Sequence, residues 1–144
     1  MKEKIYIIYA SNTGNTETLA QMIKEHLSVP ATVVSVTDVN LDDMSNSDLV
    51  LFGSSTWGYG NLQDDFEEFI EQMTPGRLAG KNVAVFGCGD QDNFEDMFCH
   101  ATDIIREKAL ECGANIVAEN LRINGQPEDY EDLVIDFVSS LPLS

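Results

Sequence analysis

An apolar run, Ile5-Tyr6-Ile7-Ile8, leads into the hydroxyl-rich turn Tyr9-Ala10-Ser11-Asn12-Thr13-Gly14-Asn15-Thr16. The residues that follow, Glu17 to Ile23, have the apolar spacing of an amphipathic helix. This order predicts a buried strand that passes through a tight turn into a helix. This strand, turn and helix form the unit from which the rest of the fold is predicted.

The chemistry of the turn favours an anion as its ligand. The first N–H groups of a helix are unpaired and carry about half a positive charge, and small residues allow a phosphate to approach them. Ser11, Thr13 and Thr16 add hydroxyl donors. The turn has no Lys or Arg and only one glycine, so it matches neither the triphosphate loop nor the three-glycine dinucleotide turn. It suits one terminal phosphate, or it is an ordinary capped helix start.

Composition places the chain among acidic globular proteins. With 144 residues, of which 43% are hydrophobic, the sequence predicts a single domain spanning residues 1–144. It carries 25 Asp and Glu against 8 Lys and Arg, a formal net charge of −17. Such a surface repels nucleic acid and anionic membranes and attracts basic proteins. We therefore expect protein partners with basic faces, and neither nucleic acid nor a membrane.

The ends and the cysteines of the sequence indicate a reducing compartment. The first residues lead directly into a strand, with no signal-peptide pattern and no apolar run of membrane-spanning length. Cys88, Cys99 and Cys112 are odd in number and lack metal-ligand spacing. We expect a cytoplasmic protein with reduced thiols and no metal site.

Strand-like and helix-like segments alternate along the chain. The expected strands are residues 4–9, 31–36, 48–53, 81–87 and 114–118, the last possibly extending to 123. The first expected helix begins at the turn and stops near Pro30. Three more are expected at 64–73, 95–111 and 127–141, and Gly113 is the expected left-handed C-cap of the helix 95–111. This alternation predicts an α/β fold with a doubly wound, five-stranded parallel sheet. Ligands of such sheets bind beyond the carboxyl ends of the strands.

Two further loops at these strand ends have unusual chemistry. Residues 54–62, after the third expected strand, place Trp57 and Tyr59 among glycines and hydroxyls. Residues 87–94, after the fourth, combine glycines with acids and Phe94. These aromatic residues either cover the protein's own core or contact a flat apolar ring. Together with the phosphate turn, they indicate a monophosphorylated aromatic cofactor.

Three motifs in this order resemble those of the flavodoxins. The stretch 11–17 is similar to their flavin phosphate loop, and Ser55-Thr56-Trp57-Gly58 and Gly87-Cys88-Gly89-Asp90 are similar to their two ring-binding loops. The resemblance covers essentially the whole chain, which lacks the segment that interrupts strand five in longer relatives. It implies a short-chain flavodoxin with three layers and strand order 2-1-3-4-5. It also implies FMN as the cofactor and low-potential, one-electron transfer.

The resemblance also implies roles for individual residues. The phosphate would be bound by Ser11, Asn12, Thr13, Gly14, Asn15 and Thr16. Ser55 and Thr56 would lie near the phosphate and ribityl chain, and Trp57 would cover the inner face of the ring. Gly58 would permit the peptide before Tyr59 to turn toward the ring nitrogen N5 on reduction. Backbone groups around Cys88, Gly89, Asp90, Met97 and Cys99 would contact the pyrimidine.

The outer face of the ring is assigned less directly. Similar flavodoxins stack a tyrosine there, but the loop Asp90 to Cys99 is about two residues longer than their pattern and has no tyrosine. Its first aromatic residue is Phe94, to which we assign the outer stack. Tyr59 and Met97 remain alternatives.

The sequence lacks residues that two other classes of protein require. A phosphorylation-switch receiver needs acids after strand one and a lysine ending strand five, whereas this chain has Ala10-Ser11 and no lysine after Lys108. A low-molecular-weight phosphatase needs Cys-x5-Arg, which is absent. A flavin-dependent reductase of the same fold, such as a quinone reductase, remains the alternative. We expect no catalytic residue, a monomer, and partners such as a flavodoxin reductase or oxidoreductases with basic docking faces.

Overall fold

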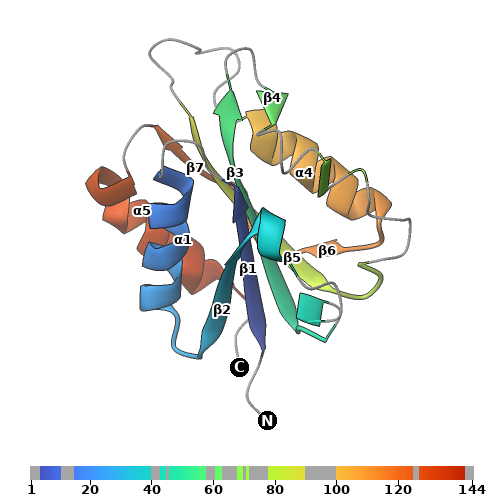
Figure 1. Ribbon diagram of the computed structural model, residues 1–144. Coiled ribbons are helices and arrows are strands. Elements are labelled where there is room, and N and C mark those ends of the chain that lie inside the picture. The colour runs from blue at the N-terminus through green and yellow to red at the C-terminus, as the bar shows by residue number, and fades with distance from the viewer. Residues whose placement is uncertain are drawn as a thin grey trace.

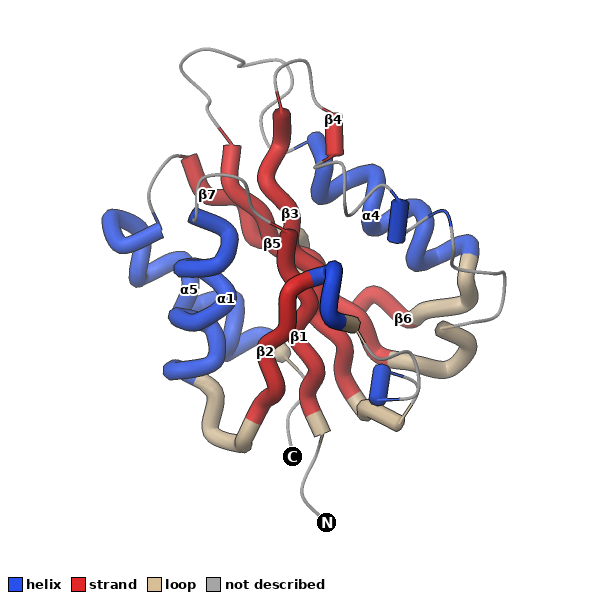
Figure 2. The backbone as a smooth tube through the Cα atoms, in the orientation of Figure 1, coloured by secondary structure: helices blue, strands red, loops and turns tan. Residues whose placement is uncertain are grey.

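The computed structural model describes residues 4–10, 15–39, 43–44, 46–57, 61–62, 68–69, 71, 78–89, 100–124 and 127–141. Its centre is a sheet of parallel strands in the order β2-β1-β3-β5-β6, with β7 also beside β5 (Figures 1 and 2). The strands are β1 Ile5–Ala10, β2 Ala31–Ser35, β3 Leu49–Trp57, β4 Asn61–Leu62, β5 Asn82–Gly89, β6 Asn115–Ile116 and β7 Leu121–Asn124. Only β4 is antiparallel among the described pairings, and it extends β3 at one end.

Helices cover both faces of the sheet. Helix α1, Asn15–His26, and helix α5, Glu131–Ser140, pack on one face, and α4, His100–Glu111, packs on the other (Figure 1). The described residues also include two short 3-10 helices. The first, η1 Val36–Asp38, follows β2, and the second, η3 Pro127–Tyr130, leads directly into α5. Within the described part of the chain, no helix has the length and apolar character needed to cross a membrane.

The alternation of side chains along each strand divides the core in two. Ile8, Phe52 and Val85 belong to the cluster under α4, together with Ile105 and Ala109 of that helix. The intervening residues form the second cluster, which contains Ile7, Leu51 and Ala84 of the strands with Leu19, Ile23, Val134 and Phe137 of α1 and α5. Both faces of the central strands are buried, which is why their sequences are continuous apolar runs.

The sequence prediction of a three-layer, doubly wound sheet is confirmed. In order along the chain, the five main strands adopt the predicted arrangement 2-1-3-4-5, with β6 and β7 together as the fifth. Helix α1 ends at His26, four residues before Pro30. Gly113 has φ of +92°, as expected for a left-handed C-cap.

Three predicted boundaries are wrong. The third strand does not end at Gly53 but continues through Trp57, because β5 pairs with it as far as Ser55 and β4 pairs with Thr56 and Trp57. The fourth strand likewise includes Cys88 and Gly89, which lie beside Ile123 and Asn124. The fifth strand, predicted over 114–118 and possibly on to 123, is shorter: β6 covers only Asn115–Ile116, and the possible continuation is a separate strand, β7.

One predicted helix falls largely outside the described residues, and another does so in part. In the predicted helix 64–73, residues 68, 69 and 71 are described, and all three are helical. Phe69 is buried there with its ring centroid 6.2 Å from that of Phe52. Residues 95–99 of the helix predicted over 95–111 are not described, and α4 is described from His100.

Candidate functional site

The carboxyl ends of three strands meet at one edge of the sheet. Ala10, the last residue of β1, lies opposite Ser54 of β3, and Ser54 lies opposite Gly87 of β5. Helix α1 begins at the same edge (Figure 1). Its first residue, Asn15, is the next described residue after Ala10. The three segments with predicted site chemistry therefore all start from one place, as expected for ligand binding in an open α/β sheet.

Thr16 is the most informative described residue at this edge. It lies in the first turn of α1 and is completely buried, with 0% of its surface exposed. Its hydroxyl oxygen Oγ1 forms no hydrogen bond within the described structure. A buried polar group without a partner costs about 1–3 kcal/mol, so this hydroxyl marks a position where a ligand would supply the partner.

Buried polar residues accompany Thr16 on the neighbouring elements. Ser54 of β3 and Thr102 of α4 are also completely buried. Ser54 directly follows the apolar run of β3 and opens its polar end, a signal that the sequence contained but that our interpretation did not use. The carboxyl edge thus concentrates hydroxyl groups on three elements that converge.

Acidic groups lie close to the same corner. The pKa of the Tyr9 phenol is raised, first by burial, then by the negative charges of Glu17 and Asp38 and by a side-chain hydrogen bond with Glu17. Each of these causes favours the neutral phenol. Tyr9 is the next-to-last residue of β1 and is partly buried, so the end of this strand is bordered by carboxylates.

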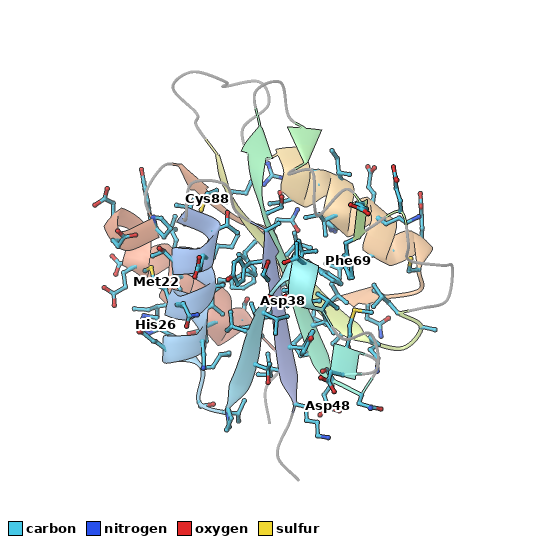
Figure 3. All side chains as sticks on the ribbon, viewed as in Figure 1. Met22, His26, Asp38, Asp48, Phe69 and Cys88 are labelled. Atoms are coloured by element: carbon cyan, nitrogen blue, oxygen red, sulfur yellow. The ribbon has the colours of Figure 1, made fainter. Side chains whose placement is uncertain are left out.

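The predicted ring-binding residues are described only in part. Residues 55–57 are in β3, where β4 holds the backbone of Thr56 and Trp57 in an antiparallel pair. Cys88 is 4% exposed and its side chain packs in the core cluster under α1 and α5 (Figure 3). The backbone of Cys88 is in β5 beside Ser55. Its side chain is therefore committed to the core, and a cofactor contact would come from its backbone.

The other predicted site residues lie outside the described residues. They are Ser11, Asn12, Thr13, Gly14, Gly58, Tyr59, Asp90, Phe94, Met97 and Cys99. Of Asn15 and Gly89, only the backbone is described, the first in α1 and the second in β5. The structure brings together the described starts of all three segments.

A family model described as flavodoxin matches residues 7–137. The chain belongs to the flavodoxin family. A flavodoxin from Maridesulfovibrio salexigens is 44% identical over 134 residues, covering 89% of this chain and 90% of that protein. A probable flavodoxin 2 from Bacillus subtilis is 36% identical over 133 residues, covering 90% and 87%. The crystal structure of oxidised flavodoxin 2 from Bacillus cereus superposes with a TM-score of 0.86 at 35% identity, covering 95% and 96%.

Membership of the family confirms the predicted activity and cofactor. This flavodoxin is an electron-transfer protein with FMN, and it is an electron carrier rather than an enzyme in the usual sense. The described residues fit that cofactor, because a buried, unpaired hydroxyl at a helix N-terminus is suited to a phosphate. FMN supplies the redox chemistry, while the protein supplies binding, orientation and electrostatics.

Proposed function

We propose that residues 1–144 form one FMN-binding domain in which the N-terminus of α1 holds the phosphate. The supporting observation is the buried Thr16 hydroxyl, which lacks a partner in the described structure. The unpaired N–H groups of the first helical turn lie at the same place and favour negative charge. Ser11, Asn12, Thr13, Gly14 and Asn15 complete the phosphate site in this proposal.

The ring is assigned to the segments that follow β3 and β5. Ser55 and Thr56 lie toward the phosphate, and Trp57 covers the inner face of the ring. The β3–β4 pair supports this role, since it fixes the backbone on which Trp57 is carried. The outer face belongs to Phe94, with Tyr59 and Met97 as alternatives, and the pyrimidine contacts come from the backbone around Cys88, Gly89, Asp90, Met97 and Cys99.

The partners are redox proteins with basic docking faces, such as a flavodoxin reductase or other oxidoreductases. The net charge of −17 supports this choice, because complementary charge speeds the encounter of proteins. Glu68 and Glu71 are exposed on the segment that follows β4. The protein acts as a monomer in the cytoplasm in this proposal, and it carries one electron at a time between partners.

The role of Thr16 is tested by removing its hydroxyl alone. Thr16→Val keeps the size of the side chain and should weaken FMN by about 1–2 kcal/mol, roughly five- to thirtyfold in Kd. Riboflavin, which lacks the phosphate, should lose no affinity. Thr18→Val, a partly exposed position in the same helix, is the matched control. Titrating apoprotein into each flavin and following fluorescence measures both constants. Equal FMN affinity in the two variants would contradict the assignment.

The docking proposal is tested by salt and by charge removal. Replacing Glu68 and Glu71 by Gln should slow association with a basic flavodoxin reductase, and the on-rate of the parent protein should fall steeply with ionic strength. Glu107→Gln with Glu111→Gln removes the same charge from exposed positions on α4 and should slow association less. Stopped-flow measurement of electron transfer gives these rates. An on-rate that is independent of salt would exclude electrostatic docking.

A further inference from the structure

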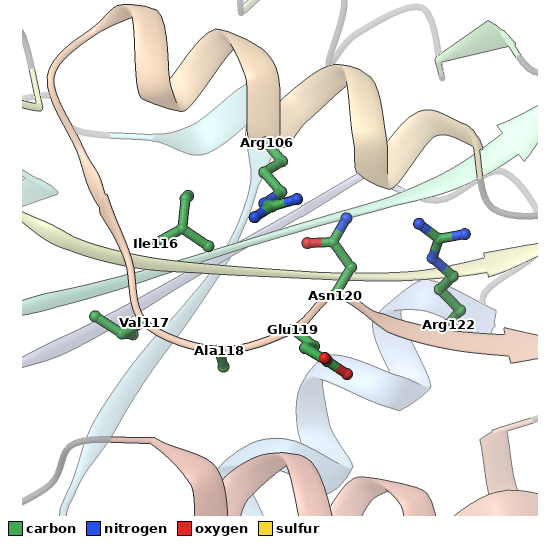
Figure 4. A pocket seen from close by; sticks show the side chains of 7 residues that line it. All are labelled: Arg106, Ile116, Val117, Ala118, Glu119, Asn120 and Arg122. Atoms are coloured by element: carbon green, nitrogen blue, oxygen red, sulfur yellow. The ribbon is translucent and has the colours of Figure 1, made fainter.

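A groove lies on the α4 face of the sheet, away from the three strand ends. Its volume is about 700 Å³, within the range of small-molecule sites. Figure 4 shows it between helix α4 and the segment that joins β6 to β7. Its lining includes Arg106, Ile116, Val117, Ala118, Asn120 and Arg122. None of these residues belongs to the proposed FMN site.

The groove exists because the edge strand is interrupted. The amide of Val117 still donates to the carbonyl of Val83 at 3.0 Å. Pairing with β5 resumes only at Leu121, which lies opposite Phe86. Residues 118–120 therefore leave the sheet and form one wall of the groove, where the Asn120 side chain points toward α4 while those of Ala118 and Glu119 point away from it (Figure 4).

Positive charge is concentrated here against the trend of the whole chain. The sequence has three arginines, Arg77, Arg106 and Arg122, and two of them line this groove. Arg122 is paired with Asp103 at 2.5 Å. Arg106 forms no ion pair or hydrogen bond in the described part of the chain. Arg106 is therefore an unpaired cation in the groove, which also has the Glu119 carboxylate in its lining. The groove is less acidic than the rest of a protein with formal net charge −17.

Asn120 adds an acceptor that lacks a donor. Its amide nitrogen donates to Asp103 Oδ1 at 3.2 Å. Because a carboxylate can only accept, this contact fixes which end of the amide is the oxygen. Asn120 Oδ1 is buried and accepts no hydrogen bond within the described structure, and in Figure 4 it points toward the side of the groove where Arg106 lies. An N–H or O–H group placed there would relieve the cost of this unpaired oxygen.

We propose that this groove binds a small organic carboxylate that has a hydrogen-bond donor next to its acid group. The carboxylate pairs with the planar guanidinium of Arg106, whose parallel N–H groups match two carboxylate oxygens. The adjacent donor bonds Asn120 Oδ1, and an apolar ring packs on Ile116, which lies on the α4 side of the sheet. The site goes beyond electron transfer and does not depend on which residues bind FMN.

The surrounding charges favour a small ligand over an acidic protein. Glu107 and Glu111 are exposed on α4, and Glu119 is exposed next to Asn120. An extended acidic surface would meet these carboxylates, and like charges placed together at an interface oppose binding. A small ligand with a single carboxylate presents only one negative charge to this surface, although Glu119 is part of the groove lining.

The FMN-loaded protein is titrated with anthranilate (2-aminobenzoate) and followed by 1H–15N NMR. Anthranilate has an amino donor beside its carboxylate, and benzoate is the same acid without that donor. We expect saturable shifts at residue 106 and across 116–122, with Kd of about 1 mM or tighter. Benzoate should bind about fivefold more weakly, because Asn120 Oδ1 stays unpaired.

Matched variants identify the residues responsible. Arg106→Gln should weaken anthranilate about tenfold or more through loss of charged hydrogen bonds, while Arg106→Lys should retain part of the affinity. Lys24→Gln removes one positive charge from an exposed position on α1 and should change nothing. The backbone spectrum of each variant verifies its fold. Equal binding to Arg106→Gln and the parent, shifts confined to other residues, or no saturation by about 20 mM would overturn the proposal.

Discussion

Described polar groups at the two ends of the parallel sheet differ in whether they have hydrogen-bond partners within the protein. At the amino end, the amide of Lys4 donates to Asp48 Oδ2 at 2.8 Å and the amide of Asp48 donates to the carbonyl of Lys4 at 2.8 Å. Lys81 Nζ also reaches the carbonyl of Ser47 at 3.2 Å. At the carboxyl end, the hydroxyl of Thr16 is buried without a partner in the described structure. Figure 3 labels one residue near each end, Asp48 and Cys88.

This difference predicts that the two ends of the sheet contribute to different properties, the amino end to folding stability and the carboxyl end to cofactor binding. The amino end satisfies its polar groups with its own chain, so changes there should affect folding and leave FMN affinity alone. In our proposal FMN supplies the missing partner at the carboxyl end, so some changes there should affect the apoprotein and the FMN complex in opposite directions. The following predictions test that division.

The largest effect among these predictions is expected at Gly87 of β5, which lies against the backbone of β3 and a side chain of α4. A Cβ on Gly87 would lie 2.6 Å from the carbonyl oxygen of Ser54 and 2.7 Å from Thr102 Cγ2. Ser54 and Thr102 are completely buried, so the backbone must shift. Gly87→Ala should lower the free energy of unfolding by about 3 kcal/mol, as measured by urea denaturation of the apoprotein. FMN affinity should fall as well, because the strands that carry the ring-binding segments move.

Gly80→Ala separates close packing from backbone strain. Gly80 has φ of +74°, but a Cβ there would meet no atom within 4 Å. Its substitution should cost only about 1 kcal/mol and leave FMN affinity unchanged. If Gly87→Ala lowers the free energy of unfolding no more than Gly80→Ala does, the close contacts with Ser54 and Thr102 are not the reason that glycine is needed at position 87.

The second prediction concerns the apoprotein with Thr16→Val. Removing a buried hydroxyl that has no partner should raise the free energy of unfolding of the apoprotein by about 1 kcal/mol. The same substitution should lower FMN affinity, so its effect reverses sign when the cofactor binds. Urea denaturation with and without saturating FMN measures both effects. Destabilisation of the apoprotein would show that the hydroxyl is not an unsatisfied group.

The third prediction concerns the amino end. Asp48→Ala removes the acceptor of the Lys4 amide and should lower the free energy of unfolding by about 0.5–1 kcal/mol. FMN affinity should not change, since Asp48 lies at the opposite end of β3 from the ring-binding segment. A change in FMN affinity comparable to that of Thr16→Val would remove the distinction between the two ends.

The sequence predicted the centre of the fold because burial on both faces leaves a simple pattern. The runs Ile5 to Ile8 and Leu49 to Phe52 can only be central strands of a covered sheet, whatever their partners. Pro30 and Gly113 act through local backbone geometry, so their effects on the helix ends were also predictable. Family motifs then supplied the order of the strands and the cofactor.

The parts that the sequence did not predict depend on pairing between distant segments. Ser54 to Trp57 has the polar composition of a loop, but β4 and β5 pair with its backbone and keep it in the strand. The break between Ile116 and Leu121 gives no local signal, since the apolar residues on either side suit one continuous strand. The unpaired state of Thr16 depends on everything packed around it. The roles assigned to all of the cofactor-binding residues stay predictions.

The smallest effect is expected at Tyr9, and it depends on pH. Burial and the carboxylates of Glu17 and Asp38 raise the pKa of its phenol above its ordinary value near 10. The neutral phenol is therefore favoured in the folded state, and this contribution to stability is present below about pH 10 and lost as pH rises through the raised pKa. Tyr9→Phe removes the group that titrates. Its free energy of unfolding should be slightly lower than that of the parent at pH 7, because the hydrogen bond with Glu17 is lost, and should fall less steeply above about pH 10. Urea denaturation at intervals from neutral to alkaline pH measures both slopes. Parallel slopes would mean that the carboxylates at this end of the sheet do not act on Tyr9, and the acidic character of the carboxyl end would then rest on its more distant residues.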